Sequence, residues 1–484
     1  MAKTETKGEK SGFVQHLTPR DVDFAQWYTD VVTLTDLCDY APVRGCMVVK
    51  PYGTAIWERI KEEMDSRFKA TGHENVMMPM LIPESLLLKE AEHVEGFAPE
   101  VAWVTQGGKE TLQEKLAIRP TSEVLFSVMY AKWLQSWRDL PLLYNQWCSV
   151  MRWEKTTRPF LRTAEFWWQE GHTLHETAEE AQEETMRMLD IYRQVCEEVL
   201  AMPVYSGLKS DSEKFAGAVA TYSIEAMMQD GKSLQAGTSH NFGDNFTKAY
   251  EISFLARDGK LTHPFGTSWG TSTRLIGALI MAHGDERGLK LAPKIAPYQV
   301  VVVPVAQHKE GVVEGAKAVA DALVKAGIRV KFDSRDTVSP GFKFNDWELK
   351  GVPVRLEIGP RDLAANQAVC VRRDTYEKTT VSLDGIADAM KTLLAAIQSN
   401  MYDTAKGFMD AHTETVTSFD RLKEVVQWGF AKAMWCGEAG CEDAIKAESG
   451  AGTRNMPFDQ TPFDDHCVHC GKPAKHVMYF AKAY

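Results

Sequence analysis

The sequence predicts an α+β protein built from about three domains. Its 484 residues exceed what one hydrophobic core usually organises, because a domain averages roughly 150 residues. The amino-acid composition and its patterning also change twice along the chain. Residues 18–288 are dense in tryptophan, methionine and arginine, residues 291–400 alternate strand-like with helical runs, and residues 401–484 hold four of the nine cysteines. We therefore predict domains at 1–290, 291–400 and 401–484.

Composition excludes several classes of protein. Hydrophobic residues at 44% and charged residues at 25% are typical of a globular protein, not of a disordered or fibrous one. The net charge of −11 argues against a general coat for nucleic acid, although a local basic site remains compatible with it. Met1–Gly12 lacks the apolar run of a signal peptide, and the apolar stretch Val300–Val305 is far shorter than the roughly 20 residues of a membrane span. We expect a cytoplasmic protein with no membrane partner.

The first domain is predicted to contain a helix that begins near Thr54. Ile60, Met64 and Phe68 recur at the spacing that places apolar side chains on one helical face. The following run, Val76–Pro83, is apolar and punctuated by prolines, which suits an edge or interface strand.

The second domain is predicted to be a compact α/β unit. After a proline-rich linker at 291–297, Tyr298–Val305 has the composition of a buried strand. Val312–Val324 carries a helical apolar stripe that ends before Gly327. Further strands are expected at 328–332, 352–358 and 368–371, and strands that alternate with helices indicate this fold class.

The first polar cluster is Arg119-Pro120-Thr121-Ser122-Glu123. On an extended segment Thr121 and Glu123 share a face, where both could accept hydrogen bonds from a substrate ammonium group. The alternative is a helix start, with Thr121 or Ser122 as the N-cap and Glu123 in the first turn. The two interpretations are compatible.

The second cluster spans Met151–Glu154 and Phe160–Thr173. We expect Arg152 and Glu154 on one face of a strand, and Trp168, Glu170 and His172 on one face of the next. Two strands joined by an arginine-bearing loop could present a guanidinium to a phosphate. A surface ion pair is the alternative, but the neighbouring aromatic side chains disfavour it because a buried charge is costly without a partner or a ligand.

The third and fourth clusters are Leu234–Gly243 and Thr267–Ile280. His240, beside small residues, would by itself be interpreted as structural. In the fourth cluster a glycine allows close approach of a ligand, and Arg274 follows at the start of a predicted helix, an arrangement that can bind phosphate. The alternative is a capped core helix with a solvated arginine.

In this order the clusters resemble the motifs of class II aminoacyl-tRNA synthetases, and their residues resemble prolyl-tRNA synthetases of the archaeal and eukaryotic-like type. The resemblance runs from about Asp21 through Gly341–Leu349 and Glu357–Asp362. It implies a catalytic domain on an antiparallel sheet, an α/β anticodon-binding domain, a small zinc-binding C-terminal domain and a homodimer. The matching residues are Pro79 for motif 1, Arg152, Trp153, Glu154 and Arg162 for motif 2, and Ser272, Thr273 and Arg274 for motif 3.

The resemblance implies that proline and ATP form prolyl-adenylate, from which proline passes to the 3′ end of tRNA(Pro). The attacking carboxylate is already ionised, so catalysis would come from positioning and from cations. The implied catalytic residues are Arg152 and Arg274. Those implied for proline are Thr121, Glu123, Arg152, Trp168, Glu170, His172 and His240; those for ATP are Arg152, Glu154, Arg162, Thr163, Gln235, Thr238, Ser272 and Arg274, with Gln235 near Mg²⁺.

Two positions depart from the family pattern. Ala164 stands where relatives commonly have arginine, and Asp244 where glutamine is usual, which leaves details of the motif 2 loop and the adenosine pocket open. The segment between Arg162 and Ser268 is too short for the editing domain of many bacterial-type relatives. Because a pocket rejects a smaller amino acid only weakly, we expect mischarged alanine not to be cleared in cis.

In the second domain the resemblance implies that Glu348 and Arg355 read the two guanines of the proline anticodon. Arginine and carboxylate side chains suit the edges of guanine. The alternative is a surface ion pair, which would contribute little to stability.

In the third domain Cys436-x4-Cys441 and Cys467-x2-Cys470 form two close pairs, a pattern that fits a tetrahedral zinc site. His466 and His469 are rival ligands, and four unrelated thiols are the remaining alternative. The resemblance favours the four thiolates in a structural role, and it also implies that the carboxylate of Tyr484 lies near the active site.

Two other functions were weighed. A threonyl enzyme of the same subclass would require a zinc-bound amino-acid site in the catalytic domain, where the cysteines are scattered. A catalytically silent relative that only binds tRNA or zinc would be expected to have lost some of Glu123, Arg152 and Arg274, all of which are present.

Overall fold

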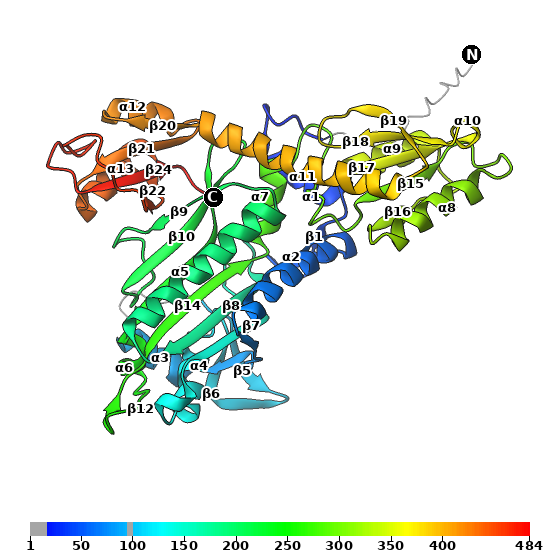
Figure 1. The fold of residues 1–484 in the computed structure, drawn as a ribbon. Helices are drawn as coiled ribbons and strands as arrows, with labels where there is room; N and C mark the ends of the chain where they lie inside the picture. The colour runs from blue at the N-terminus through cyan, green and yellow to red at the C-terminus, as the bar shows by residue number, and fades with distance from the viewer. Residues whose placement is uncertain (1–16, 94–99) are drawn as a thin grey trace, which may run out of the picture.

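The computed structural model describes residues 17–93 and 100–484, so the predicted tail Met1–Gly12 lies outside the described residues. Figure 1 shows a central sheet with one smaller α/β body on each side of its upper end. The long helix α11, Ile386–Ala411, runs across the top from one body to the other and crosses residue 400. In the described part of the chain, no helix is both long and apolar enough to cross a membrane.

The catalytic body is built on an eight-stranded sheet in the order β23-β9-β10-β11-β14-β8-β7-β3. Neighbouring strands are antiparallel except for β3 and β7, which confirms the predicted antiparallel sheet. The strand bounds are β3 Glu74–Asn75, β7 Leu142–Met151, β8 Glu165–His175, β9 Val204–Leu208, β10 Ala220–Met227, β11 Ser233–Gly243, β14 Phe265–Ser272 and β23 Met456–Pro457.

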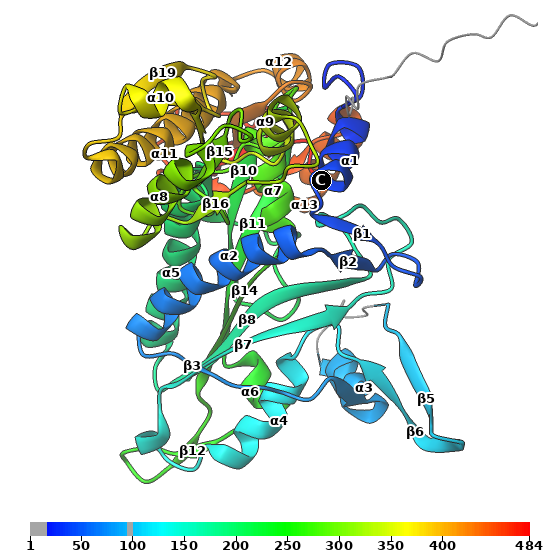
Figure 2. The same ribbon diagram turned by 90° about the vertical axis from the view of Figure 1, so that its right-hand side faces the viewer.

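Helices bury one face of this sheet. Helix α5, Ala178–Gln194, contacts β11 and β14, and α2, Pro51–Ala70, contacts α5 (Figures 1 and 2). Trp269 of β14 is fully buried beneath them, and a Cβ on Gly171 of β8 would lie 2.1 Å from its ring, so only glycine fits there. Helix α2 contains the helix predicted near Thr54 but begins earlier, whereas α1, Phe24–Leu34, was not predicted. Helix α7 is Arg274–His283.

A smaller sheet with the order β4-β6-β5 lies beside the main sheet and contacts α3, which in turn contacts α4 (Figure 2). Only residues 81–83 of the predicted strand Val76–Pro83 form one. The bounds are β4 Leu81–Pro83, α3 Glu84–His93, β5 Trp103–Gly107, β6 Glu110–Ile118 and α4 Glu123–Trp133, with hairpins β1 Cys38–Tyr40 and β2 Met47–Val49, β12 Phe254–Leu255 and β13 Leu261–Thr262, and the short helix α6 Asn245–Ala249.

The second domain has the predicted α/β architecture, with the strand order β16-β15-β17-β18-β19. The predicted strands and helix are present with shifts of one or two residues at their ends. Gly327 follows α8 in the left-handed conformation, with φ of 85°, as expected of a glycine that terminates a helix. The bounds are β15 Val300–Pro304, α8 Val312–Lys325, β16 Val330–Phe332, α9 Pro340–Leu349, β17 Val354–Ile358, α10 Pro360–Ala364, β18 Gln367–Arg372 and β19 Lys378–Ser382.

The C-terminal domain has a four-stranded sheet of its own, in the order β20-β21-β24-β22. Its strand β23 leaves this domain and extends the catalytic sheet beside β9, so the two bodies share backbone hydrogen bonds. The remaining bounds are β20 Thr413–Val416, α12 Phe419–Val425, β21 Phe430–Trp435, α13 Ala439–Ser449, β22 Gly452–Thr453 and β24 His476–Ala481.

Candidate active site

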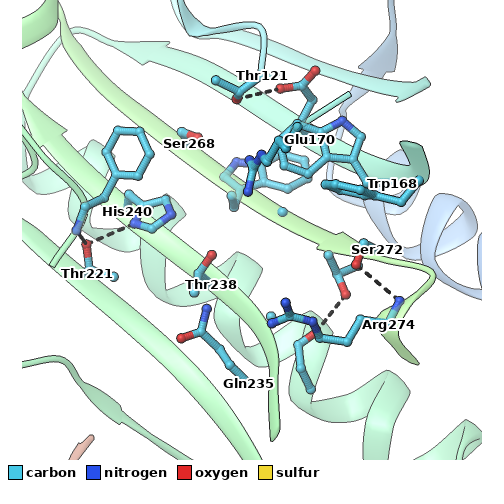
Figure 3. Close-up of a pocket in the computed structure, with 18 of the residues that line it drawn as sticks. Thr121, Trp168, Glu170, Thr221, Gln235, Thr238, His240, Ser268, Ser272 and Arg274 are labelled. Atoms are coloured by element: carbon cyan, nitrogen blue, oxygen red, sulfur yellow. Dashed lines mark hydrogen bonds between the residues drawn. The ribbon is translucent and has the colours of Figure 1, made fainter. Parts of the chain in front are cut away.

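A cavity of about 340 Å³ opens on the face of the main sheet opposite α5. In Figure 3, Thr121 and Glu170 lie on one side of the hollow and Gln235 and Thr238 on the other. Of the residues that the family resemblance placed at the substrates, His172 alone is not among those that line this cavity. Those that do are Thr121, Glu123, Arg152, Glu154, Arg162, Thr163, Trp168, Glu170, Gln235, Thr238, His240, Ser272 and Arg274.

The expected strand position of Arg152 and Glu154 is wrong, because β7 ends at Met151. Both residues lie just beyond the strand, where the chain turns into the motif 2 loop. Arg152 Nε donates to the carbonyl of Pro120 at 3.1 Å, and the guanidinium lies 5.5 and 5.3 Å from the ring centres of Phe166 and Trp168. Leaving the strand lets the arginine turn over these two rings and into the cavity.

Two partly buried arginines face the cavity and form no ion pair with a carboxylate of the described residues. Arg274, at the start of α7, donates Nε to the carbonyl of Leu161 at 3.2 Å, and the hydroxyl of Ser272 accepts its main-chain N–H. Burial lowers the pKa of Arg152 and of Arg274, and the charge of Arg152 lowers that of Arg274 further. In the described residues neither forms an ion pair within 4.0 Å. Such a pair of cations is suited to an anionic ligand that lies between them.

The motif 2 loop carries a third arginine at the mouth of the cavity. Arg162 forms an ion pair with Glu154 at 2.7 Å, and its side chain is 62% exposed. Thr163 donates its hydroxyl to the carbonyl of Glu165 at 2.7 Å. Because the arginine is exposed, it can exchange its partner for a substrate phosphate at little cost.

Glu170 is a buried carboxylate at the centre of a hydrogen-bond network. It accepts from the amide of Ser122 at 3.1 Å, from Gln146 Nε2 at 2.6 Å and from His172 Nε2 at 3.1 Å. Burial by itself raises its pKa, but the interactions with His172, Ser122 and Gln146 outweigh burial and leave the pKa below its usual value. Glu170 therefore remains an anion. His172 contacts the cavity residue Glu170 and borders a smaller pocket.

Thr121, Ser122 and Glu123 form the start of α4, as the helix-start interpretation predicted. Ser122 is the N-cap, but its side chain forms no cap bond and instead donates to Glu170 at 2.5 Å. Thr121 donates to Glu123, whose carboxylate is buried. One carboxylate oxygen each of Glu123 and Glu170 and one imidazole nitrogen of His172 lie within 4.8 Å of one another. Two carboxylates at this separation repel, which suits a cation such as a secondary ammonium group between them.

His240 and its neighbours form a further wall of the cavity. His240 Nδ1 lies 2.9 Å from Thr221 Oγ1, and burial lowers the pKa of His240 to about 3, so its ring is neutral near pH 7. Phe215 lies 4.9 Å away, centre to centre. Four lining residues belong to none of the sequence motifs, and the sequence holds no local signal for them: Lys209, Glu213, Phe215 and Thr221.

The two residues expected to read the anticodon lie close together in the second domain. Glu348 ends near Arg355, with an Nη1–Oε2 distance of 3.7 Å, and accepts from Arg287 at 3.0 Å. Arg355 also pairs with Glu357 at 3.0 Å and lies 4.6 Å from the ring centre of Phe344. Both residues line one small pocket of this domain.

The four clustered cysteines converge in the C-terminal domain. The Sγ atoms of Cys441 and Cys467 are 3.6 Å apart, and those of Cys436 and Cys470 are 3.7 Å apart. A tetrahedral site with Zn–S bonds of about 2.3 Å has S···S separations of about 3.8 Å, so the four sulfurs fit this metal. Of the rival ligands, His469 lies 3.6 Å from Cys441 Sγ but also contacts Glu448.

The C-terminal residue lies beside the catalytic sheet. The amide of Tyr484 donates to the carbonyl of Ser233, and its hydroxyl donates to Asp230 at 2.6 Å. Burial raises the pKa of the Tyr484 hydroxyl, and the charge of Arg158 in the motif 2 loop opposes this shift.

Comparison with known proteins agrees with this architecture. Residues 103–283 match the class II tRNA synthetase core domain (G, H, P, S and T), residues 299–393 an anticodon-binding domain, and residues 419–484 the C-terminal domain of prolyl-tRNA synthetase. The fold and the cavity are thus those of a class II aminoacyl-tRNA synthetase.

Similar full-length proteins show which family of this class the chain belongs to. The chain is 62% identical to the proline–tRNA ligase of Alkaliphilus oremlandii, over 99% of this chain and 100% of that protein. It is 58% identical to proline–tRNA ligase 2 of Clostridioides difficile, over the whole of both chains. The chain belongs to the prolyl-tRNA synthetase family, in the archaeal and eukaryotic-like type with a C-terminal four-cysteine cluster.

Proposed function

We propose that the chain activates L-proline with ATP and transfers it to tRNA(Pro), with each of the domains 1–290, 291–400 and 401–484 serving a different part of the task. The observation that carries the residue assignments is the charge arrangement of the cavity. Among the described residues, Arg152 and Arg274 form no ion pair within 4.0 Å, and no lysine or arginine pairs with Glu123 or Glu170, which lie close together. ATP and proline supply the missing charges. A tRNA-charging enzyme of this kind would work in the cytoplasm.

In the proposed mechanism, the proline carboxylate attacks the α-phosphorus in line and pyrophosphate leaves. Arg152 contacts both the carboxylate and the α-phosphate, which holds the reacting atoms together and stabilises the charge that develops. Glu123 and Thr121 accept from the proline nitrogen, while Trp168, Glu170, His172 and His240 shape the pocket. No residue needs to remove a proton from the nucleophile.

On the nucleotide side, Arg274 and Ser272 contact the γ-phosphate. Glu154, Arg162 and Thr163 position ATP from the motif 2 loop, and Gln235 and Thr238 contact it from β11. Mg²⁺ would be held near Gln235, where it would neutralise phosphate charge. Zn²⁺ would be held by Cys436, Cys441, Cys467 and Cys470, a closed shell that leaves no position for chemistry and therefore supports folding.

Recognition of tRNA is assigned to the second domain, through Glu348 and Arg355. Arg287 pairs with Glu348 Oε1, so a guanine that binds Glu348 would displace Arg287 from this oxygen. The exposed arginine, at 57% side-chain exposure, makes that exchange inexpensive.

We propose a homodimer that forms over the small sheet. Large apolar side chains are exposed there, including Met77 at 90%, Leu88 at 58% and Met80 at 51%. A cluster of this kind is unusual on a monomer and is typical of a protein interface.

Proline-dependent exchange of pyrophosphate into ATP tests the function. The wild-type protein should exchange with proline and not with threonine, which separates it from a threonyl enzyme and from a silent relative. Arg152→Ala should abolish exchange and leave the fold intact, whereas Arg59→Ala, on the exposed face of α2, should change neither. Near-wild-type exchange by Arg152→Ala would exclude its assigned role. We also propose that mischarged alanine is not cleared in cis, so the enzyme should not rapidly hydrolyse alanyl-tRNA(Pro), and rapid hydrolysis would overturn this prediction.

A further inference from the structure

One cation that lines the cavity belongs to none of the motifs. Lys209 follows β9, and its side chain is 4% exposed. Its ammonium lies 3.7 Å from Glu225 Oε1 and 3.9 Å from Glu213 Oε2, both beyond hydrogen-bond length. Burying an ammonium group is costly unless it serves a close partner or a ligand. Because Lys209 lines the cavity, its charge is available to a bound anion.

The ammonium lies at the nucleotide end of the cavity. Glu225, its nearer carboxylate, stands directly opposite Gln235 in the pairing of β10 with β11. Burial lowers the pKa of Arg274, and the charge of Glu225 opposes this shift. Gln235 lies on the side of the hollow away from Thr121 (Figure 3). Through Glu225, Lys209 therefore shares its surroundings with the residues proposed for ATP.

The C-terminal domain contacts Ser210, the residue that follows Lys209 in the chain. The buried hydroxyl of Ser210 donates to Glu442 Oε1 at 2.9 Å, and Thr453 donates to the same oxygen. Glu442 is 5% exposed and follows Cys441 directly in α13. In the described part of the chain its second oxygen has no hydrogen-bond partner. Burying a carboxylate with so few partners costs stability, so a role in positioning its neighbours would account for this residue.

The backbone around this contact is closely fitted. Met456 of β23 pairs with Leu208, and fully buried Asn455 donates to the carbonyl of Tyr205 at 2.9 Å. A Cβ on Gly207 would lie 2.2 Å from the carbonyl oxygen of Met456, so only glycine permits this approach. The end of β9 is thus held by the C-terminal domain on both its backbone and its side chains.

We propose that Lys209 binds the phosphate groups of ATP and that Glu442 is a positioning residue, which acts through Ser210 to hold Lys209 in place. The inference rests on the proposed function, since it requires ATP as the substrate. Lys209 remains an ammonium throughout and contributes charge, not proton transfer. The C-terminal domain would then contribute to nucleotide binding from a distance.

Steady-state exchange kinetics test the lysine. Lys209→Met should raise KM for ATP about tenfold, the equivalent of one charge-assisted hydrogen bond, and leave KM for proline unchanged. Lys209→Arg should restore most of the loss. Lys214→Met is the matched control, because Lys214 lies on the same segment but pairs with Asp211 and does not line the cavity. An unchanged KM for ATP in Lys209→Met would overturn the proposal.

The positioning role requires a second comparison. Glu442→Gln and Ser210→Ala should each raise KM for ATP about threefold, in the same direction as Lys209→Met. Glu438→Gln, at the exposed start of α13, should not. If Glu442 acts through Lys209, the double variant Lys209→Met, Glu442→Gln should match Lys209→Met alone.

Two outcomes contradict the positioning role. Additive effects in the double variant would show that Glu442 acts by another route, and an unchanged KM for ATP in both Glu442→Gln and Ser210→Ala would show that it does not act at all. If Glu442→Gln fails to fold, the KM for ATP of Ser210→Ala alone decides whether the positioning role holds. Absence of exchange in the wild-type protein would instead reject the proposed function itself.

Discussion

The contact between the catalytic and second domains gives a quantitative prediction. Arg373, with 3% side-chain exposure, donates to both oxygens of Asp285 at 2.7 and 2.8 Å and to the main-chain carbonyl of Glu348 at 2.8 Å. Asp285 lies just beyond α7, the helix that begins at Arg274. Arg373→Met would leave Asp285 partly buried with Lys290 at 3.1 Å as its remaining cation.

We expect this change to reduce the free energy of unfolding by about 3 kcal/mol, because removing one partner of a buried pair leaves the other uncompensated. The Lys290 contact keeps the loss at the low end of the usual range. Urea unfolding followed by tryptophan fluorescence measures it. Lys317→Met, which removes an exposed ion pair within α8, should change the value by less than about 1 kcal/mol.

The pH dependence of this difference provides a further check. Burial would raise the pKa of Asp285, but Arg373 and Lys290 hold it well below its usual value. The pair's contribution is therefore fully present above the unfolded pKa of about 4 and is lost as pH falls through the folded pKa. The difference between wild type and Arg373→Met should shrink below about pH 4. Equal stability of the two proteins at pH 7, or a difference that grows in acid, would refute this reasoning.

Three further predictions follow from local geometry. Gly171→Ala should destabilise the protein by about 1–3 kcal/mol, measured by urea unfolding, because its Cβ would overlap the ring of Trp269; wild-type stability would contradict this packing. Cys467→Ser should abolish bound zinc, measured by atomic absorption, whereas His466→Ala, with a 69% exposed imidazole, should retain it. Burial lowers the pKa of His175 and His283 to about 4 and that of His240 to about 3, so these rings stay neutral in the folded protein while their unfolded counterparts titrate near 6.5. Stability should therefore fall as pH drops from about 6.5 towards 4, by up to about 1.4 kcal/mol per pH unit for each histidine. His283→Gln should reduce proton uptake on unfolding at pH 5 by about one, measured by calorimetry in buffers of different ionisation enthalpy.

The sequence predicted best those features that depend on local spacing. The second domain's strands and α8 follow from short apolar runs and from Gly327, since each periodicity is complete within one element. The four cysteines were predicted to converge, and their sulfurs do so. Local start signals likewise indicated that Glu123 begins α4.

Features that depend on distant parts of the chain could not be predicted in this way. The alternation of side chains expected along a strand predicted that Arg152 lies on one. The strand ends one residue earlier, where the chain turns away from the sheet. Lys209 belongs to no motif; it follows β9, lies beside Glu225 of β10, and its neighbour Ser210 contacts Glu442 in another domain. No local pattern encodes a pairing between residues separated by so much sequence.

The pairing of β23 with β9 also bears on how the protein is synthesised. Until residues 456–457 leave the ribosome, β9 is an open edge of the catalytic sheet, with unpaired N–H and carbonyl groups available to other chains. A nascent chain must therefore wait for almost its whole length before this sheet is closed. A premature stop shortly after residue 450 would leave a nearly complete catalytic domain with a permanently exposed edge, prone to aggregation and to recognition by chaperones.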